Sequence, residues 1–288
     1  MKRSDWIITA LLFIAAVLMF NTFIRHDRTR VSLTRGNLIG VVKIQGAILN
    51  AEPILEDLEE ISSIRDLKAL ILHINSPGGG TAPSQELYYA VKRIKEEYGY
   101  PVISVLSSLG ASGGYYVALA TDSIYALPGT LTGSIGVIMD FPQWTEVMDK
   151  IGVDMHVVKS GEYKDTGSPY RDFTTEDRRY YQELVNDVYD QFISAVADAR
   201  SMDKETVKKL SDGKVYTGRQ ALELGLIDHL GTVEDGIEDL TRQLNLKDKP
   251  SIIRPKKEKI TFYDVVFGDI SRWIGSLVPS PSPQMIYK

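Results

Sequence analysis

The pentapeptide Gly110-Ala111-Ser112-Gly113-Gly114 lies between two apolar runs of the chain. The run before it, residues 101–106 (PVISVL), has β-strand character, and the run after it, residues 115–120 (YYVALA), suits a helix. A strand that meets a cluster of glycines and then a helix makes a sharp turn. Small residues at such a turn can serve close packing alone, and the pentapeptide by itself favours that interpretation.

The serine at the apex of this turn admits a second interpretation. Its hydroxyl would be exposed, and the N–H groups of the residues that follow would point at the same spot. Backbone donors beside a nucleophile hold the negative charge that develops during acyl transfer. Ser112 is therefore a candidate nucleophile.

The composition is that of an ordinary globular protein, with 43% hydrophobic and 25% charged residues among 288. A net charge of −5 gives no reason to expect a nucleic-acid partner. The absence of cysteine excludes thiol catalysis, disulfides and cysteine metal sites. A histidine metal site is not expected either, because the four histidines lie far apart: His26, His73, His156 and His229.

Residues 6–24 form an apolar run that is interrupted only by Thr9, Asn21 and Thr22. As a helix the run would be about 28 Å long, close to the roughly 30 Å hydrocarbon core of a bilayer. No small-x-small cleavage pattern follows it, so we predict an uncleaved anchor rather than a signal peptide, with a buried core helix as the other alternative. Basic residues flank both ends, and charge alone does not decide the orientation.

Strand and helix patterns alternate along residues 37–245, which predicts one α/β domain with mainly parallel strand pairing. The longest helix is expected over residues 174–200, where Thr174 and Asp177 form a capping-box start. Further strands are expected at residues 39–44, 69–74, 101–106, 123–127, 135–139 and 153–158, and further helices at 53–64, 84–98 and 142–151.

The two ends of the chain are predicted to lie outside this domain. Residues 1–36 would hold the anchor and a juxtamembrane linker. Residues 246–288 would hold a basic linker, an amphipathic helix over 262–278 and a stiff Pro/Ser tail.

A base for Ser112 is not obvious among the histidines. His73 and His156 alternate within apolar runs and are expected in the core or on a sheet face. A lysine is the remaining option, although a reference pKa near 10.4 leaves only about one lysine in 2,500 neutral at pH 7. A catalytic lysine must therefore be desolvated or held by groups that favour the neutral amine. Lys164 lies in a loop of small residues, where a solvent-exposed lysine without a catalytic role is the alternative.

A second glycine cluster, Gly78-Gly79-Gly80, follows the strand predicted at residues 69–74 and precedes a helix. Its free N–H groups could bind an anion. The phosphate-loop pattern GxxxxGK[ST] is absent. An oxyanion hole fits better, with the N–H groups of Gly79 and Gly113 on either side of Ser112.

Four motifs in this order resemble the signal peptide peptidase A family: NSPGGG at residues 75–80, GASGGYY at 110–116, TGSIGV at 132–137 and KSGEYKD at 159–165. The resemblance covers residues 37–240. Members of this family are membrane-anchored serine peptidases with a Ser/Lys dyad. Their α/β fold is ClpP/crotonase-like, with repeated ββα units, and the resemblance implies that fold here.

The resemblance also implies a role for each candidate residue. Ser112 would be the nucleophile, Lys164 the general base and Ser134 the serine that orients the lysine. Gly79 and Gly113 would form the oxyanion hole. No metal, cofactor or ATP is implied.

Residual signal peptides and other hydrophobic peptides would be the substrates, cleaved by a domain outside the cytoplasmic membrane. The single copy of the domain is similar to the short form of the family, which forms homo-oligomeric rings. Serine and lysine of one site can then come from neighbouring protomers. Two alternatives stay open: a crotonase-like acyl-group enzyme without the dyad, and a non-catalytic membrane scaffold.

Overall fold

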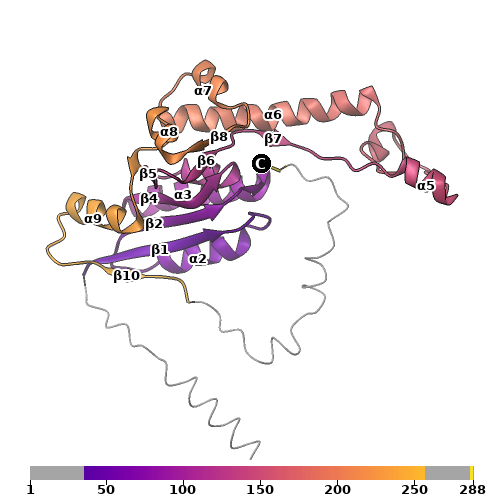
Figure 1. Cartoon of the computed structure of the whole chain (residues 1–288). Coiled ribbons are helices and arrows are strands. Elements are labelled where there is room, and N and C mark those ends of the chain that lie inside the picture. The colour runs from indigo at the N-terminus through magenta and orange to yellow at the C-terminus, as the bar shows by residue number, and fades with distance from the viewer. Residues whose placement is uncertain (1–35, 257–285, 288) are drawn as a thin grey trace, which may run out of the picture. The chain divides into compact units, whose positions relative to one another are not determined.

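A computed structural model describes residues 36–256 and the backbone of 286–287 (Figure 1). The predicted anchor at residues 6–24 and the predicted amphipathic helix at 262–278 lie outside the described residues. Contacts separate Met1–Arg35 from Gly36–Lys288. Within the described ranges, no helix combines the length and the apolar character that crossing a bilayer requires.

The body is built on an eight-stranded sheet, and this confirms the predicted α/β fold with mainly parallel pairing. Six strands form its main path in the order β10-β1-β2-β4-β5-β9, and every neighbouring pair on that path is parallel. β6 pairs with β4 in parallel, and β8 pairs with β6 in antiparallel. The strands are β1 (Leu38–Gln45), β2 (Leu67–Ser76), β4 (Val102–Ala111), β5 (Ser123–Ala126), β6 (Leu131–Gly133), β8 (Val215–Thr217), β9 (His229–Leu230) and β10 (Ser251–Ile253).

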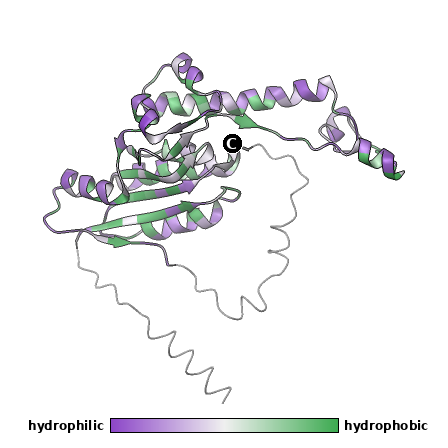
Figure 2. Cartoon of the chain, in the orientation of Figure 1, coloured by the Kyte–Doolittle hydropathy of each residue, from purple (hydrophilic) through white to green (hydrophobic). Residues whose placement is uncertain are grey.

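Successive side chains of a strand point to opposite faces of the sheet, and they form two hydrophobic cores, one on each face. Val42 and Leu72 face one core, while Val41 and Ile71 face the other. The larger core is covered by α2 (Glu52–Ser62), α3 (Thr81–Tyr98), α4 (Gly113–Ala118), α7 (Lys204–Leu210), α8 (Gly218–Glu223) and the C-terminal half of α6 (Thr175–Arg200). The smaller core is covered by α9 (Val233–Gln243). Apolar strands between helices with hydrophilic outer surfaces are visible in Figure 2.

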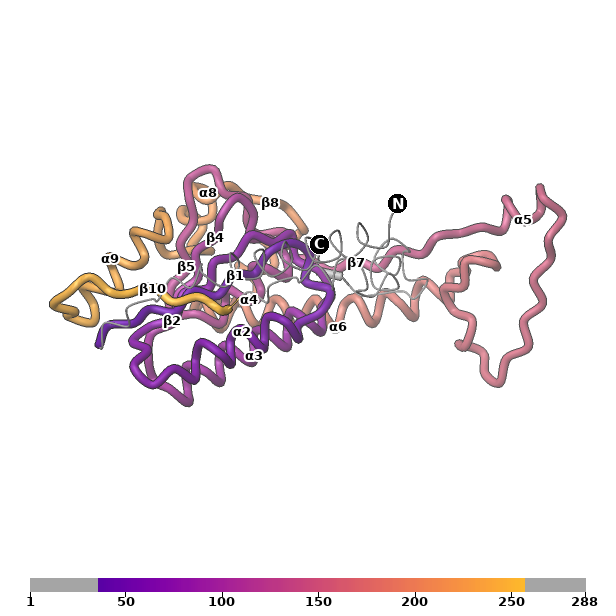
Figure 3. Tube along the Cα trace, turned by 90° about the horizontal axis from the view of Figure 1, so that it is seen from below, coloured from indigo at the N-terminus to yellow at the C-terminus, as the bar shows by residue number. Residues whose placement is uncertain are grey.

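Residues 139–173 leave the body as an arm, which both Figure 1 and Figure 3 show projecting away from the sheet. The arm holds α5 (Thr145–Ile151) and the 3-10 turn η1 (Glu162–Asp165). The strand predicted at residues 153–158 is absent, and every residue from 151 to 164 is exposed. The alternation of this segment was therefore misleading, because no neighbouring strand pairs with it. For the same reason the prediction that His156 is a core residue is wrong.

Six strands of the described chain were not expected, namely β3 (Gly79–Gly80), β6, β8, β9, β10 and β11. β10 lies within the predicted basic linker and extends the sheet beside β1. β11 (Ile286–Tyr287) is the middle strand of a small antiparallel sheet, between β3 (Gly79–Gly80) and β7 (Val137–Ile138). The predicted strand over residues 135–139 is present only as the two residues of β7.

Candidate active site

Ser112 lies at the junction between the last residue of β4 and the first residue of α4. Its φ of 53° and ψ of −120° match the first central residue of a type II′ turn, where glycine is favoured. The backbone is fixed on both sides of this strained residue. The Ser112 N–H donates to the Gly133 carbonyl at 2.8 Å, and its carbonyl accepts from the Tyr116 N–H at 2.8 Å.

The glycines around Ser112 are required by close packing between α3, α4 and the loop after β2. A Cβ on Gly113 would collide with the Ser84 hydroxyl oxygen and would lie 3.3 Å from the Gly79 nitrogen. The Gly79 and Gly113 positions are therefore adjacent. Gly113 is also the first residue of α4, so its N–H has no acceptor within the helix.

Ile48 supports the Gly79 position and was not found from the sequence. It forms an isolated parallel bridge with Gly79, and its carbonyl accepts from the Gly80 N–H at 2.8 Å. A Cβ on Gly79, whose φ is +158°, would collide with the Ile48 backbone. No signal marks Ile48 in the sequence, because the contact uses main-chain atoms only.

Ser134 lies close to this turn. Its neighbour Gly133 is the acceptor for the Ser112 N–H, and its own N–H donates to the Lys214 carbonyl at 2.7 Å. Ser134 is buried, and its φ of 49° is rare for a residue other than glycine. Ser112 and Ser134 thus both have a positive φ, and the hydrogen bond from the Ser112 N–H to the Gly133 carbonyl links the two turns.

The Ser112 hydroxyl is buried, which corrects the expectation that it is exposed. In the described part of the chain its oxygen has no hydrogen-bond partner. Leaving a buried hydroxyl unpaired costs about 1–3 kcal/mol. Such a group can bond to a partner that the described residues do not supply.

Lys164 does not meet Ser112 in this structure. It is exposed on η1, whose Tyr163 donates its hydroxyl to Glu176 at 3.2 Å and packs on the Tyr180 ring. The other half of α6 reaches the body, where Phe192 contacts Tyr116. The helix between residues 180 and 192 is about 18 Å long, so η1 and Lys164 lie away from the body.

A charged network shapes the loop that carries Lys164. Arg171 donates to Asp177 at 2.8 Å and to Asp165 at 3.4 Å, while Lys159 donates to Asp165 at 2.7 Å. The predicted capping box of Thr174 and Asp177 is confirmed. The bond from Arg171, followed by those from Thr174, holds the pKa of Asp177 well below its usual range.

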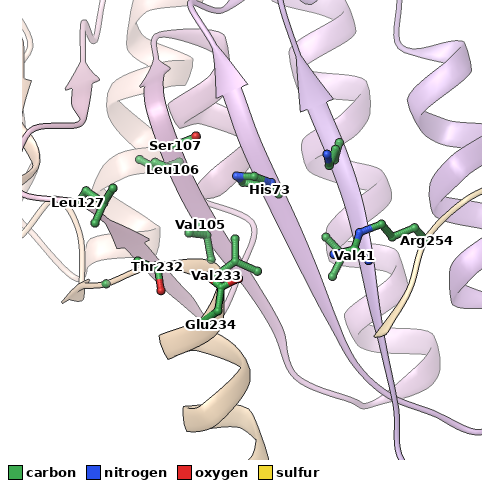
Figure 4. A pocket seen from close by; sticks show the side chains of 12 residues that line it. Val41, His73, Val105, Leu106, Ser107, Leu127, Thr232, Val233, Glu234 and Arg254 are labelled. Carbon is green, nitrogen blue, oxygen red and sulfur yellow. The ribbon is translucent and has the colours of Figure 1, made fainter. Parts of the chain in front are cut away.

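None of the described histidines bonds to the Ser112 hydroxyl. His73 lines a pocket with Val41 and Val105 on the face of the sheet beside α9 (Figure 4). Burial and the nearby charge of Lys43 lower its pKa. His229 packs against the Tyr125 ring at 4.6 Å, and His156 is on the exposed arm. Within residues 36–256, no cluster of His, Asp and Glu could hold a metal ion.

Comparison with known proteins identifies the family of the chain. The model of peptidase family S49 matches residues 94–247, more than half of the chain. The chain is 40% identical over 216 residues to a Synechocystis protein described as a protease, covering 75% of this chain and 74% of that protein. The chain therefore belongs to peptidase family S49.

Two further relatives carry more specific descriptions. A protein of Enterococcus faecium described as a signal peptide peptidase SppA is 36% identical over 227 residues, 78% of this chain and 65% of that protein. The chloroplast serine protease SPPA of Arabidopsis thaliana is 30% identical over 239 residues, 82% of this chain and 35% of that protein. The matched stretch thus spans less than two thirds of each of these two relatives.

Proposed function

We propose that the chain is a serine endopeptidase in which Ser112 is the nucleophile and Lys164 the general base. Gly79 and Gly113 form the oxyanion hole, and Ser134 orients the lysine. The observation that carries the proposal is the strained backbone of Ser112 beside two adjacent glycine positions. The proposal assigns the fold to the ClpP/crotonase type with repeated ββα units, and the parallel sheet with its glycine turns supports that assignment.

The proposed substrates are residual signal peptides and other apolar peptides. Residues 6–24 anchor the protein in the cytoplasmic membrane, and the catalytic domain works outside it. The description of the Enterococcus faecium relative supports this substrate class. The apolar composition of residues 6–24 supports the anchor.

The chemistry needs no metal or cofactor. The Ser112 hydroxyl oxygen attacks the scissile carbonyl carbon while Lys164 accepts its proton. The carbonyl oxygen becomes an oxyanion held by the Gly79 and Gly113 N–H groups, each a donor of the kind worth about 10²–10³ in rate. The C–N bond then breaks, and the lysine returns the proton to the leaving amine. Water activated by the same lysine hydrolyses the acyl-enzyme.

Lys164 reaches Ser112 from a second copy of the chain in this proposal. The isolated arm supports that arrangement, because it leaves apolar side chains in water. Ile151, Val157 and Val158 are 66%, 54% and 101% exposed. Clusters of exposed apolar residues mark interaction surfaces. A homo-oligomeric ring would cover them and complete each site.

Covalent labelling with a fluorophosphonate tests the nucleophile. The wild-type protein should be labelled and the Ser112→Ala variant should not. Ser108→Ala is the matched control, since Ser108 is an exposed serine on β4, the strand that ends just before Ser112. Lys164→Ala should be labelled about 100-fold more slowly or worse, because general-base assistance is lost.

The same experiment separates the alternatives. A crotonase-like enzyme without the dyad, or a non-catalytic scaffold, would give no Ser112-dependent label. Labelling that persists in Ser112→Ala would place the nucleophile elsewhere and refute the proposal. Mapping the products of an apolar peptide with wild-type and Ser112→Ala protein then identifies the bonds that are cut.

A further inference from the structure

The pocket that His73 lines is a second concave site, on the face of the sheet beside α9 (Figure 4). Its volume is about 280 Å³. β1, β2 and β4 line it from the sheet, and the start of α9 and the segment after β10 complete it. None of the described residues that line it belongs to the candidate active site. A ligand bound here would therefore contact residues other than the proposed dyad.

The register of the sheet brings three basic side chains to this pocket. Lys43 of β1 and His73 of β2 are register partners. Partners on neighbouring strands lie about 4.8 Å apart and point to the same face. Arg254 comes directly after β10, which pairs with β1 on its other edge. All three side chains line the pocket.

The positive charge of the pocket is not balanced. Glu234 is the one carboxylate among the described lining residues, against the two permanent charges of Lys43 and Arg254. Neither cation forms an ion pair with another residue that the structure describes. Burial and then the charge of Lys43 lower the pKa of His73, with Arg254 acting in the same direction and Glu234 in the opposite one. An anion in the pocket would pair with both cations.

The rest of the lining limits which anion fits. Apolar side chains line the pocket beside the cations: Val41, Val105, Leu127 and Val233. An inorganic ion would use the cations alone and leave Leu127, which is 45% exposed, in water. A carboxylate suits the planar donor group of an arginine, and ligand pockets combine apolar walls with a few charged groups. An apolar molecule that carries a carboxylate would use both parts of this lining.

We propose that this pocket binds the carboxylate of a small apolar molecule. Lys43 and Arg254 hold the carboxylate, while Val41, Val105 and Leu127 contact the apolar group. The C-terminal residue of an apolar peptide and a short fatty acid both have this chemistry. The inference does not depend on the catalytic role of Ser112.

Calorimetric titration of the full chain in detergent tests the proposal. N-acetyl-leucine should bind with a Kd of about 1 mM or lower, and N-acetyl-leucinamide, which lacks the charge, should not bind. Lys43→Gln and Arg254→Gln should each weaken binding about threefold or more. Lys68→Gln is the matched control, because Lys68 is an exposed lysine of β2 outside the pocket, and it should bind as wild type.

Two further probes define the ligand. Hexanoate that binds more tightly than N-acetyl-leucine identifies a fatty acid as the source of the carboxylate, and the opposite order identifies a peptide end. Inorganic phosphate should bind more weakly than either probe. Phosphate that binds as tightly, or an amide that binds as tightly as the acid, would overturn the proposal.

Glu234 and His73 provide tests in which binding should improve. Glu234→Gln removes the opposing carboxylate and should tighten binding about threefold. Binding should also be tighter at about pH 5.5 than at about pH 7.5, because a protonated His73 adds a positive charge, and His73→Gln should remove this difference. Weaker binding in Glu234→Gln, or the same pH dependence in His73→Gln, would contradict the assigned roles.

Fluorophosphonate labelling separates this proposal from the proposed chemistry. Lys43→Gln and Arg254→Gln should be labelled at Ser112 at the rate of the wild type, since neither residue belongs to the dyad. Unchanged N-acetyl-leucine affinity in both variants, or an equal loss in Lys68→Gln, would refute the carboxylate pocket even where Ser112 is labelled. Binding as expected in a chain that forms no label would leave the pocket established and remove the catalytic role of Ser112.

Discussion

At the scale of single residues, the backbone around Ser112 is held in a conformation that L-amino acids avoid. Its φ of 53° is maintained by hydrogen bonds to Gly133 and Tyr116. Conformations of this kind cost about 1–3 kcal/mol and persist only where the surroundings enforce them. Here the glycines on both sides allow α3 and α4 to approach and enforce the turn.

Gly113 provides a test of this packing. Gly113→Ala should destabilise the protein by about 1–3 kcal/mol, because the added methyl collides with the Ser84 hydroxyl oxygen. Ser84→Ala removes that oxygen, so the double variant should be more stable than the sum of the single effects predicts. Urea unfolding of the four proteins measures the coupling.

Gly129→Ala is the control for this cycle, since a Cβ there meets nothing within 4 Å and the φ of Gly129 is not positive. It should change stability by less than about 0.5 kcal/mol. Strict additivity between positions 84 and 113 would contradict the packing account.

At the scale of elements, the start of α6 and the arm are joined by the buried carboxylate of Asp177. Arg171 and the Thr174 cap both bond to it. The Asp177 side chain is only 5% exposed, so these partners satisfy a charge that water cannot reach. The loop that carries Lys164 depends on this junction.

The lowered pKa of Asp177 predicts how the junction responds to pH. A carboxyl whose pKa is lower in the folded state contributes stability above its unfolded pKa of about 3.9, and that stability is lost as the pH falls. We expect the protection of the amides at residues 171–178, which is their exchange rate relative to the unstructured peptide at the same pH, to fall below about pH 4, while the sheet stays protected. In Asp177→Asn this protection should be low already at pH 7 and vary little between pH 4 and 7. Equal pH dependence in both proteins would exclude this carboxyl as the cause.

At the scale of the whole molecule, the two residues of the proposed dyad lie on different parts of the chain, the body and the arm. Ser112 is buried in the body without a partner among the described residues, while Lys164 is exposed on the arm. A contact that repeats head to tail around a ring would bring each arm to the neighbouring body. Each catalytic site would then form only when the ring assembles.

Mixing two inactive variants tests this arrangement. Ser112→Ala and Lys164→Ala chains, dissociated and reassembled at equal amounts, should recover about a quarter of the wild-type activity. In a randomly mixed head-to-tail ring, half of the serines and half of the facing lysines are intact. Each variant reassembled alone is the control and should stay inactive. Absence of recovery in assembled mixtures would favour a site within one chain.

The sequence alone was sufficient to predict the features that depend on local residue patterns. Short apolar runs predict the strands β1 and β2, and Thr174 with Asp177 predicts the start of α6. The ordered glycine and serine motifs predict the protease family. Each of these signals lies within a few consecutive residues, so no distant partner is needed to recognise it.

Only the tertiary structure decided what depends on distant partners. Residues 153–158 alternate like a strand but have no neighbour to pair with, and Ser112 is buried although its turn suggested exposure. β3 and β11 pair through main-chain N–H and C=O groups, which every residue except proline has. No side-chain pattern in the sequence therefore predicts this pairing. The position of Lys164 follows from the length of α6 and the path of the arm, and neither can be read from the residues around the lysine.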